Sequence, residues 1–282
     1  MIKNDSHPDI LSIELHGISF LARSGAWNDF WNLMKNGDWE NETFVVFDKF
    51  IDKQHSYLDI GSWIGPTLMY GAQKAKKAHG LEPDAVAFAE LKANVALNSS
   101  KMSNVVLHEV CIAPRCGSIA LGADGDLGSS KTTIVVDNKR ARWIVTGMTL
   151  QVFMEKHSIE DCNFIKMDIE GGEYRVVPET SEYLRRKRPT LYLSLHPFCL
   201  GCPSLKKVPL LGAFANIVAR FWHSLRLVYA LRHYKYRFDP DGNLMSQFSV
   251  WANSMILYSL SVVFTDLPWP LSSATTAREM SR

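Results

Sequence analysis

Residues 55–74 read HSYLDIGSWIGPTLMYGAQK, and this stretch decides the fold of the chain. Its first apolar residues surround Asp59, and Gly61 and Gly65 follow before a second apolar run begins at Pro66. This order predicts a β-strand, a tight glycine turn and a helix, because glycine permits backbone conformations that other residues rarely adopt. Backbone N–H groups and a helix N-terminus would then meet at one place, which suits an anionic or polar ligand.

Strand and helix patterns alternate along the rest of the chain, which indicates an α/β fold with a mostly parallel sheet. Strands are predicted at Tyr57–Ile60, His79–Leu81, Val105–Val110, Phe164–Met167, Leu191–Leu195 and Met255–Phe264. Helices are predicted at Phe44–Asp52, Pro66–Ala78, Ala85–Asn98, Leu150–His157, Ser181–Arg186 and from about Leu210 to His233. Gly117–Val145 is rich in Gly, Ser and Thr and is interpreted as a β insertion or loop region beside the sheet.

The composition is that of an ordinary globular protein, with 282 residues, 46% hydrophobic and 21% charged. A formal net charge of +2 argues against an extended nucleic-acid footprint. The five cysteines have no framework spacing, and the lone C-x-x-C at Cys199 and Cys202 is weak evidence for zinc. Reduced thiols and an N-terminus without an apolar signal region together predict a cytoplasmic protein.

A second acidic residue, Glu82, stands at the end of the next predicted strand. It lies about 20 residues beyond the glycine turn, where nucleotide-binding α/β folds place an acid on the ribose hydroxyls. Pro83 stiffens the turn that follows and offers an apolar edge to an adenine ring. The turn is D-x-G-x-x-x-G, not G-x-G-x-x-G, which disfavours a nicotinamide-dependent oxidoreductase. Asp59 could instead accept hydrogen bonds from the ammonium group of an amino-acid moiety.

The segment FIKMDIEGGEYRVV, residues 164–177, places three acidic residues around the end of another strand. Asp168 directly follows the apolar residues, at the carboxyl end, where open α/β sheets bind their ligands. Glu170 and Glu173 fall at the start of the next helix, and for Glu173 stabilisation of that helix N-terminus is the favoured role. The three carboxylates could hold a divalent cation, but nothing fixes a ligand set, and no metal is predicted.

His196 ends the alternating segment RPTLYLSLHPF, again at the carboxyl end of a strand. An imidazole with its ordinary pKa of about 6.5 could remove a proton from an acceptor hydroxyl. It could equally cap the strand and pack under the next helix. The sequence leaves both roles open.

Four segments together resemble the successive motifs of the FkbM-type methyltransferases, a family of class I S-adenosyl-L-methionine-dependent enzymes. They are YLDIGSWIG, LEPDAVAFAELKANVALN, FIKMDIEGGEYRVV and RPTLYLSLHP. The resemblance runs from about Glu40 to His196, with a weaker echo at VVFTDLPW, and MDIEGGE is its most specific part. Ser62 and Trp63 stand where the family usually has Ala and Asn, and the C-terminal third matches poorly.

The resemblance implies a Rossmann-like class I methyltransferase sheet, mostly parallel and seven-stranded, with an antiparallel last strand and helices on both faces. It implies S-adenosyl-L-methionine as the methyl donor. Carried over by position, the cofactor-binding residues would be Asp59, Gly61, Ser62, Gly65, Glu82 and Pro83. The catalytic residues would be Asp168 and His196, either of which could be the base, and Glu170, which could orient the acceptor.

The predicted function is therefore methylation of oxygen, at a hydroxyl of a sugar, glycan or natural product. The alternative within the same chemistry is an N- or protein methyltransferase. Such enzymes often present an Asn/Asp-Pro-Pro-aromatic strand end to the amine, and MDIEGG occupies that place here. An alternative from another class is a non-catalytic Rossmann-like binding module. The presence of Asp59, Gly61, Gly65 and Glu82 favours the enzyme.

The chain divides into four predicted parts. They are an N-terminal helical segment or cap (1–40), an S-adenosylmethionine-binding core (41–200), a C-terminal helix with closing strands that could cover the acceptor site (201–270), and a disordered tail (271–282). The expected partner is a small-molecule or glycan acceptor, and no nucleic acid is expected.

The apolar start of Val208–Leu231 is shorter than the roughly 20 residues of a membrane span, and Arg220, His223 and Arg226 follow it. No transmembrane segment is therefore predicted. Residues 208–237 mix cations with aromatic residues, and could touch a membrane peripherally or bind a phosphate-bearing or lipid-linked acceptor. They could also be the solvated face of a surface helix.

Overall fold

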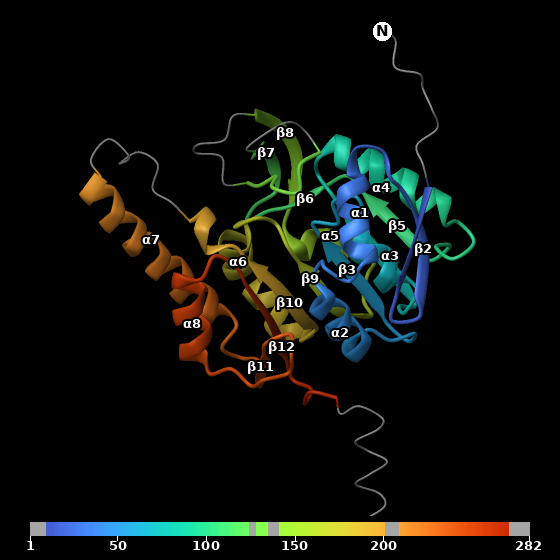
Figure 1. Ribbon diagram of the computed structural model, residues 1–282. Coiled ribbons are helices and arrows are strands. Elements are labelled where there is room, and N and C mark those ends of the chain that lie inside the picture. Colours follow the sequence, from blue (N-terminus) through green and yellow to red (C-terminus); the bar gives the residue numbers. More distant parts are fainter. Residues whose placement is uncertain (1–9, 124–127, 135–140, 201–208, 271–282) are drawn as a thin grey trace, which may run out of the picture.

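A seven-stranded sheet forms the centre of the computed structural model, which describes residues 10–123, 128–134, 141–200 and 209–270 (Figure 1). The strand order is β11-β12-β10-β9-β3-β4-β5. Five adjacent strands run parallel: β3 (Ser56–Ile60), β4 (Lys77–Leu81), β5 (Val105–His108), β9 (Cys162–Met167) and β10 (Thr190–Leu195). The last strand, β12 (Leu260–Thr265), lies antiparallel between β10 and β11 (Tyr236–Phe238). The predicted sheet, with its antiparallel last strand, is confirmed.

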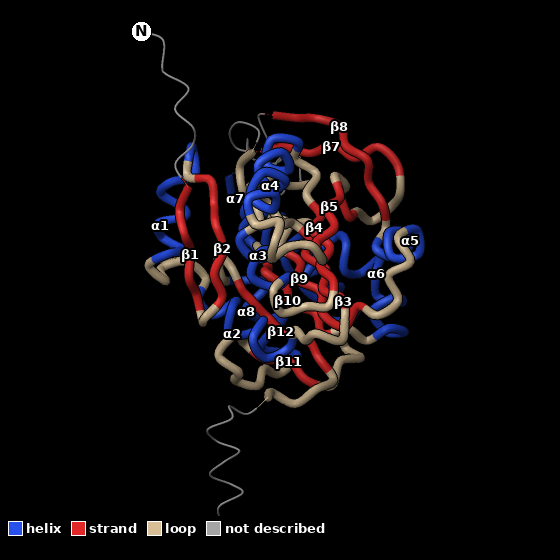
Figure 2. The backbone as a smooth tube through the Cα atoms, turned by 90° about the vertical axis from the view of Figure 1, so that its right-hand side faces the viewer, coloured by secondary structure: helices blue, strands red, loops and turns tan. Residues whose placement is uncertain are grey.

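Helices cover both faces of this sheet, so its central strands are buried on both sides. One face carries α2 (Asn41–Phe50), α3 (Pro66–Ala72) and α4 (Ala85–Leu97). The other carries α5 (Leu150–Lys156), α6 (Glu173–Lys187), α7 (Pro209–Ala230) and α8 (Gln247–Ile256). Neighbouring side chains alternate between the two cores: Tyr57 and Phe164 pack on the first face, and Leu58 and Ile165 on the second. Figure 2 shows α3 and α4 on one side of the strands and α5 and α6 on the other.

The N-terminal part is only partly the helical segment that the sequence predicted. An antiparallel hairpin, β1 (Ile10–Leu15) and β2 (Ile18–Arg23), comes first, and helix α1 (Asn28–Lys35) follows a short 3-10 helix (Gly25–Trp27). The hairpin forms because alternate apolar residues, Ile13 and Phe20 among them, are buried against α1, α3 and α4. This alternation indicates a hairpin, and the prediction of a helical segment did not take it into account.

A three-stranded sheet of β6 (Cys111–Ile112), β7 (Gly117–Ala123) and β8 (Ala141–Met148) lies beside the main sheet. The prediction of a β insertion here is confirmed. Three other predicted boundaries were wrong. The helix predicted over Pro66–Ala78 ends at Ala72. Lys77 and Ala78 pair instead with β3, and the Ala78 N–H donates to the Asn104 carbonyl just before β5. Strand pairing in the folded protein therefore overrides the local helix propensity.

Met255 and Ile256 end helix α8 and do not begin the strand predicted at Met255–Phe264, which starts at Leu260. The helix predicted over Ser181–Arg186 is the second half of α6, which continues through Pro178. The predicted C-terminal helix is α7, and none of the helices in the described part of the chain is long and apolar enough to cross a membrane.

Asn94 of α4 and Asn98, which follows the last residue of that helix, hold the hairpin to the core. The Asn98 Oδ1 accepts the Leu21 N–H at 2.8 Å, and its Nδ2 donates to the Leu21 carbonyl at 2.7 Å. The Asn94 Oδ1 accepts the Arg23 N–H at 2.8 Å. Both side chains are buried, so these amides provide for β2 the hydrogen bonds that a neighbouring strand would otherwise supply.

We expect Asn98→Ala to lower the free energy of unfolding by about 1–3 kcal/mol, because it leaves buried backbone groups of Leu21 without partners. Urea unfolding followed by circular dichroism measures this change. Lys92→Ala, on the exposed face of α4, is the control and should change stability by no more than about 0.5 kcal/mol. An equal effect of the two substitutions would contradict the role of Asn98.

Candidate active site

The glycine turn after β3 brings two strand ends into close contact. Gly61 has φ +83°, and a Cβ on it would lie 1.9 Å from the carbonyl oxygen of Asp168. Gly65 has φ +101° and precedes α3, with a Cβ position only 2.7 Å from the Leu91 side chain. Only glycine fits at these two positions, since other residues would be strained and would clash.

The N–H groups of this turn are not free for a ligand, which corrects the expectation from the sequence. Those of Gly61 and Ser62 donate to the Leu81 carbonyl at 3.0 Å, and that of Gly65 donates to the Ser62 carbonyl at 2.8 Å. The Trp63 N–H donates to Glu82 at 2.9 Å. These N–H groups find hydrogen-bond partners within the protein because β4 ends beside the turn. Contacts to a ligand would therefore come mainly from side chains.

Asp59 lies behind the turn, with no solvent exposure. Its Oδ2 accepts a hydrogen bond from the Thr67 hydroxyl at 2.8 Å, and its Oδ1 lies 3.6 Å from the Lys166 ammonium. Burial raises the pKa of this carboxyl, and the nearby Lys166 opposes that effect. Asp59 is thus separated from the cavity by the residues that it holds in place.

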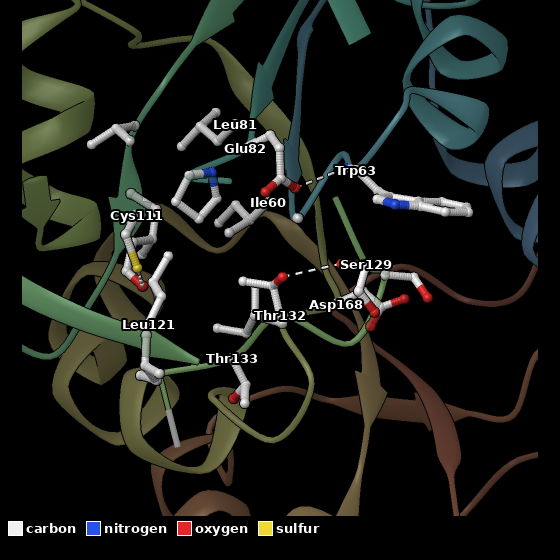
Figure 3. A pocket seen from close by; sticks show the side chains of 17 residues that line it. Ile60, Trp63, Leu81, Glu82, Cys111, Leu121, Ser129, Thr132, Thr133 and Asp168 are labelled. Carbon is white, nitrogen blue, oxygen red and sulfur yellow. Dashed lines mark hydrogen bonds between the residues drawn. The ribbon is translucent and has the colours of Figure 1, made fainter. Parts of the chain in front are cut away.

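Glu82 is a buried wall residue of a first cavity of about 530 Å³, open mouth included (Figure 3). Its two carboxylate oxygens accept the N–H groups of Trp63 at 2.9 Å and Asp84 at 2.8 Å. Burial raises the pKa of Glu82 to about 7. The apolar walls are Ile60, Leu81, Pro83, Val110, Cys111, Ile112, Leu121, Ile134 and Ile169.

Residues 128–134 lie across this cavity, and two side chains hold them there. The Trp63 Nε1 donates to the Gly128 carbonyl at 2.8 Å. The Asp84 Oδ2 accepts the Gly128 N–H at 2.7 Å and the Thr132 hydroxyl at 3.2 Å. Trp63 also packs edge-to-face on Phe30, with ring centroids 4.6 Å apart. Trp63, a departure from the family pattern, therefore holds the insertion, and its ring points away from the cavity centre (Figure 3).

A second cavity, of about 630 Å³ with its mouth, adjoins the first. The two share Gly61, Trp63, Ser130 and Asp168 as wall residues, so Asp168 stands at their junction. The other wall residues are Phe30, Trp39, Glu40, Ser62, Pro66, Thr67, Lys166, Glu170 and His196. Of the residues predicted from the sequence, Glu82 and Pro83 therefore line the first cavity. The second cavity is lined by Ser62, Glu170 and His196, and Gly65 lines neither cavity.

Lys166 and Glu40 are charged wall residues of the second cavity that the sequence analysis missed. The Lys166 Nζ donates to the Gly61 carbonyl at 3.3 Å and lies 3.6 Å from both Asp59 and Asp168. Burial alone would lower the pKa of Lys166, but these carboxylates raise it above its ordinary value. Burial raises the pKa of Glu40 to about 7, with Asp168 adding to the effect. A lysine inside the apolar strand FIKM was the available signal, because buried charges require partners.

His196 lies between two carboxylates. Its Nδ1 is 3.7 Å from Asp168 Oδ1 and 3.7 Å from Glu173 Oε1. Burial opposes protonation, but Glu173 and Asp168 outweigh it and raise the pKa of His196 to about 10. The imidazole is therefore protonated at neutral pH.

Glu173 anchors the MDIEGGE loop at the N-terminus of α6. It is fully buried, and its carboxylate accepts the N–H groups of Ile169 at 2.6 Å and Gly171 at 2.9 Å. The helix-terminus role favoured from the sequence agrees with this geometry. Three possible metal-ligand atoms, one each from Asp168, Glu173 and His196, lie within 4.8 Å of one another. They are close enough together to bind a single cation.

Glu170 sits in this loop with a left-handed backbone, φ +53°. Burial raises its pKa to about 7, and the His196 cation opposes the rise. The next residue, Gly171, has φ +89°, and its Cβ position is 2.4 Å from the Cys199 Cβ. The loop therefore packs against the turn after β10, which brings Glu170 and His196 to the same cavity.

Residues 59–237, more than half of the chain, match a family model described as the methyltransferase FkbM domain. The match begins at the aspartate of the glycine turn and includes both cavities' strand ends. The chain belongs to the FkbM methyltransferase family.

Solved structures similar to this FkbM-domain protein are distant in sequence. The methyltransferase FkbM from Methylobacillus flagellatus KT is 14% identical over 82% of this chain and 52% of its own, with TM-score 0.41. A putative SAM-dependent methyltransferase from Streptococcus mutans is 12% identical over 94% and 57%, with TM-score 0.41. TYW2 of M. jannaschii, solved in complex with AdoMet, is 11% identical over 93% and 86%, with TM-score 0.40. This chain spans about half the length of the first of these, and no curated protein matches it.

The cofactor that belongs to this family is S-adenosylmethionine. The two cavities fit its two halves by their chemistry. The first offers a buried carboxylate, Glu82, beside apolar walls, which suits a ribose and an adenine ring. The second offers the Lys166 ammonium and the Glu40 carboxylate, which suit the carboxylate and ammonium groups of an amino acid.

We expect Glu82→Ala to weaken binding of S-adenosylhomocysteine by about 1.5–3 kcal/mol, the cost of a lost hydrogen bond to a charged group. Calorimetric titration measures this change. Glu109→Ala, which removes an exposed carboxylate just after β5, is the matched control and should leave the affinity unchanged. Unchanged affinity in Glu82→Ala would remove Glu82 from the site.

The raised pKa of Glu82 also predicts a pH dependence of that binding. Ribose hydroxyls donate to the ionised carboxylate, so a Glu82 with a pKa of about 7 must lose its proton before binding. Affinity for S-adenosylhomocysteine should therefore fall about eightfold from about pH 7.5 to about pH 6. Glu82→Gln should abolish this fall. If the fall persists there and disappears in Glu40→Gln, the titrating group is Glu40.

Proposed function

We propose that this chain transfers the methyl group of S-adenosylmethionine to a hydroxyl oxygen of a sugar, glycan or natural product. When bound, S-adenosylmethionine supplies an electrophilic methyl group on a sulfonium. The observation that carries the proposal is the place of Asp168, a wall residue of both cavities within 3.7 Å of His196 and 3.6 Å of Lys166. A carboxylate at this junction could act on donor and acceptor together.

The proposed cofactor-binding residues divide by their distance from the cavities. Glu82 would accept the ribose hydroxyls, and Pro83 would pack on the adenine. Gly61 would line the junction of the two cavities, and Ser62 would line the second cavity. Asp59 and Gly65 line neither cavity and would act indirectly. Asp59 would hold Thr67 and Lys166 in place, and Gly65 would allow the backbone conformation of the turn. To these we add Lys166, facing the carboxylate of the methionine half, and Glu40, facing its ammonium group.

Of the two bases considered from the sequence, Asp168 is the one we propose. With a pKa of about 10, His196 already carries its proton at neutral pH and cannot accept another. It would instead hold the Asp168 carboxylate in place through its positive charge. Asp168 would accept the proton of the acceptor hydroxyl, and Glu170, in the same cavity, would orient that acceptor.

The MDIEGG strand end favours oxygen as the acceptor, since it offers carboxylates and no Pro-Pro-aromatic platform for an amine. The second cavity opens to solvent, so a small-molecule or glycan acceptor could enter it, and the net charge of +2 does not favour nucleic acid. The alternative is N-methylation or protein methylation by the same residues.

The test begins with calorimetric titration with S-adenosylhomocysteine, with NADH as the comparison ligand. Micromolar binding of the first alone supports the enzyme, and binding of neither by folded protein supports the non-catalytic module. A screen then supplies hydroxyl acceptors, glycans first, alongside amine analogues of matched shape. Release of S-adenosylhomocysteine with hydroxyl acceptors supports O-methylation, and release with the amines alone would overturn it.

We expect Asp168→Asn to bind S-adenosylhomocysteine within about twofold of the unmodified protein. Its turnover with the acceptor from the screen should fall by roughly 10²–10⁴-fold, the range for loss of a general base. Glu160→Gln, an exposed carboxylate before the start of the same strand, is the control and should change neither quantity. Near-normal turnover in Asp168→Asn would move the base to His196.

A further inference from the structure

Helix α7 is apolar on two opposite faces, of which the fold covers one. Leu227, in its last turn, and Leu231, just after it, are fully buried in the core. The opposite face exposes large side chains spaced mostly three and four residues apart: Phe214, Ile217, Phe221, Trp222, Leu225 and Tyr229. A helix that is apolar all round is normally covered on every side. Figure 1 shows the N-terminal half of α7 extending beyond the body of the protein.

Helix α8 extends this exposed surface. Trp251 packs edge-to-face on Phe221 with ring centroids 5.4 Å apart, and Phe248 lies 5.5 Å from Trp251. Phe248 is itself 71% exposed, as is Ile256 at the end of α8. We call the exposed side chains of α7 and α8 together the α7–α8 surface. Single exposed apolar residues are normal on a monomer, but here they are contiguous over two helices. Contiguous patches of this kind mark interaction sites.

Neither α7 nor α8 contains an acidic residue. Residues 183–238 hold eleven of the chain's 31 Lys and Arg side chains, whereas all 29 Asp and Glu lie outside them. Arg232 stacks on exposed Tyr229 with its guanidinium 3.7 Å from the ring centroid, and Lys235 follows it. Arg226 pairs with Glu179 of α6 at 3.1 Å. The apolar surface thus has a cationic border, although the whole chain is nearly neutral.

We propose that the α7–α8 surface binds the headgroup region of an anionic lipid bilayer. Trp, Phe and Leu on one face with Arg and Lys at its border are the features of helices that lie in the membrane interface. Anionic lipids supply the charge that this border lacks. A second copy of the chain is a poorer occupant, because a twofold interface would bring two acid-free segments with the same cations together.

Docking in this way would bring the segment that follows α8 near the bilayer, and this segment is linked to the wall of the second cavity. Tyr258, just after α8, stacks on Phe198 with ring centroids 4.2 Å apart, and Phe198 is 5.9 Å from His196. An aromatic path therefore leads from the surface to the cavity wall. Under the proposed function, on which this consequence alone rests, the acceptor would be membrane-borne. The docking itself is independent of methyl transfer.

Co-sedimentation of the full chain with vesicles tests the docking. Vesicles of phosphatidylcholine with phosphatidylglycerol are compared with phosphatidylcholine alone. We expect binding to the anionic vesicles to be at least tenfold tighter, since each Lys or Arg near an anionic surface contributes about fivefold. Added salt should weaken this binding, because it screens the surface charge. Equal binding to both vesicle types, or to neither, would overturn the proposal.

Variants at exposed positions distinguish binding through this surface from nonspecific binding of vesicles to any exposed apolar residue. Phe214→Glu combined with Trp222→Glu should reduce vesicle binding at least tenfold with an unchanged circular dichroism spectrum. Leu33→Glu, at a position 49% exposed on α1, is the matched control and should bind like the unmodified chain. Equal loss in both variants would overturn the proposal. So would a dimer in sedimentation velocity that dissociates in the α7 variant, since the occupant would then be a second copy.

Discussion

The backbone contact between Gly61 and Asp168 is the constraint on which the site depends. The Asp168 N–H donates to the Ile60 carbonyl at 3.0 Å, and the missing side chain of Gly61 lets the Asp168 carbonyl approach where a Cβ would lie 1.9 Å away. The carboxyl ends of β3 and β9 therefore meet without an intervening side chain. As a result, Asp168 is a wall residue of both cavities. The ammonium group of Lys166, two residues earlier in β9, lies 3.6 Å from the Asp168 carboxylate.

Charge is the second organising principle of the site. Burial raises the pKa of Glu40, Glu82 and Glu170 to about 7 each, so three carboxyls stand near the point of losing their protons at neutral pH. Each ionised form would be stabilised by a hydrogen-bond donor or cation entering the cavities. A ligand that brings hydroxyls, an ammonium group and a sulfonium supplies these partners together. Under the proposed function, S-adenosylmethionine would be such a ligand.

The sequence predicted the features that depend on local order along the chain. Asp168 and Glu82 were found because each ends a strand, and parallel strands gather their carboxyl ends at one edge of a sheet. Lys166 and Glu40 were not found, because only the pairing of β9 with β3 and the approach of the segment before α2 bring them to the cavity. The internal use of the turn N–H groups was missed for the same reason, since the Leu81 carbonyl comes from another strand.

Whole-chain averages hid the property that distinguishes the C-terminal part. A net charge of +2 describes neither the acid-free segment 183–238 nor the remainder, where acidic residues are in excess. The two parts meet at the second cavity: Glu40, Asp168 and Glu170 come from the acidic part, and His196 comes from the acid-free part. The high pKa of His196 is a product of this meeting. The uneven distribution of acidic residues along the chain therefore underlies both the raised pKa of His196 and the cationic border of the α7–α8 surface.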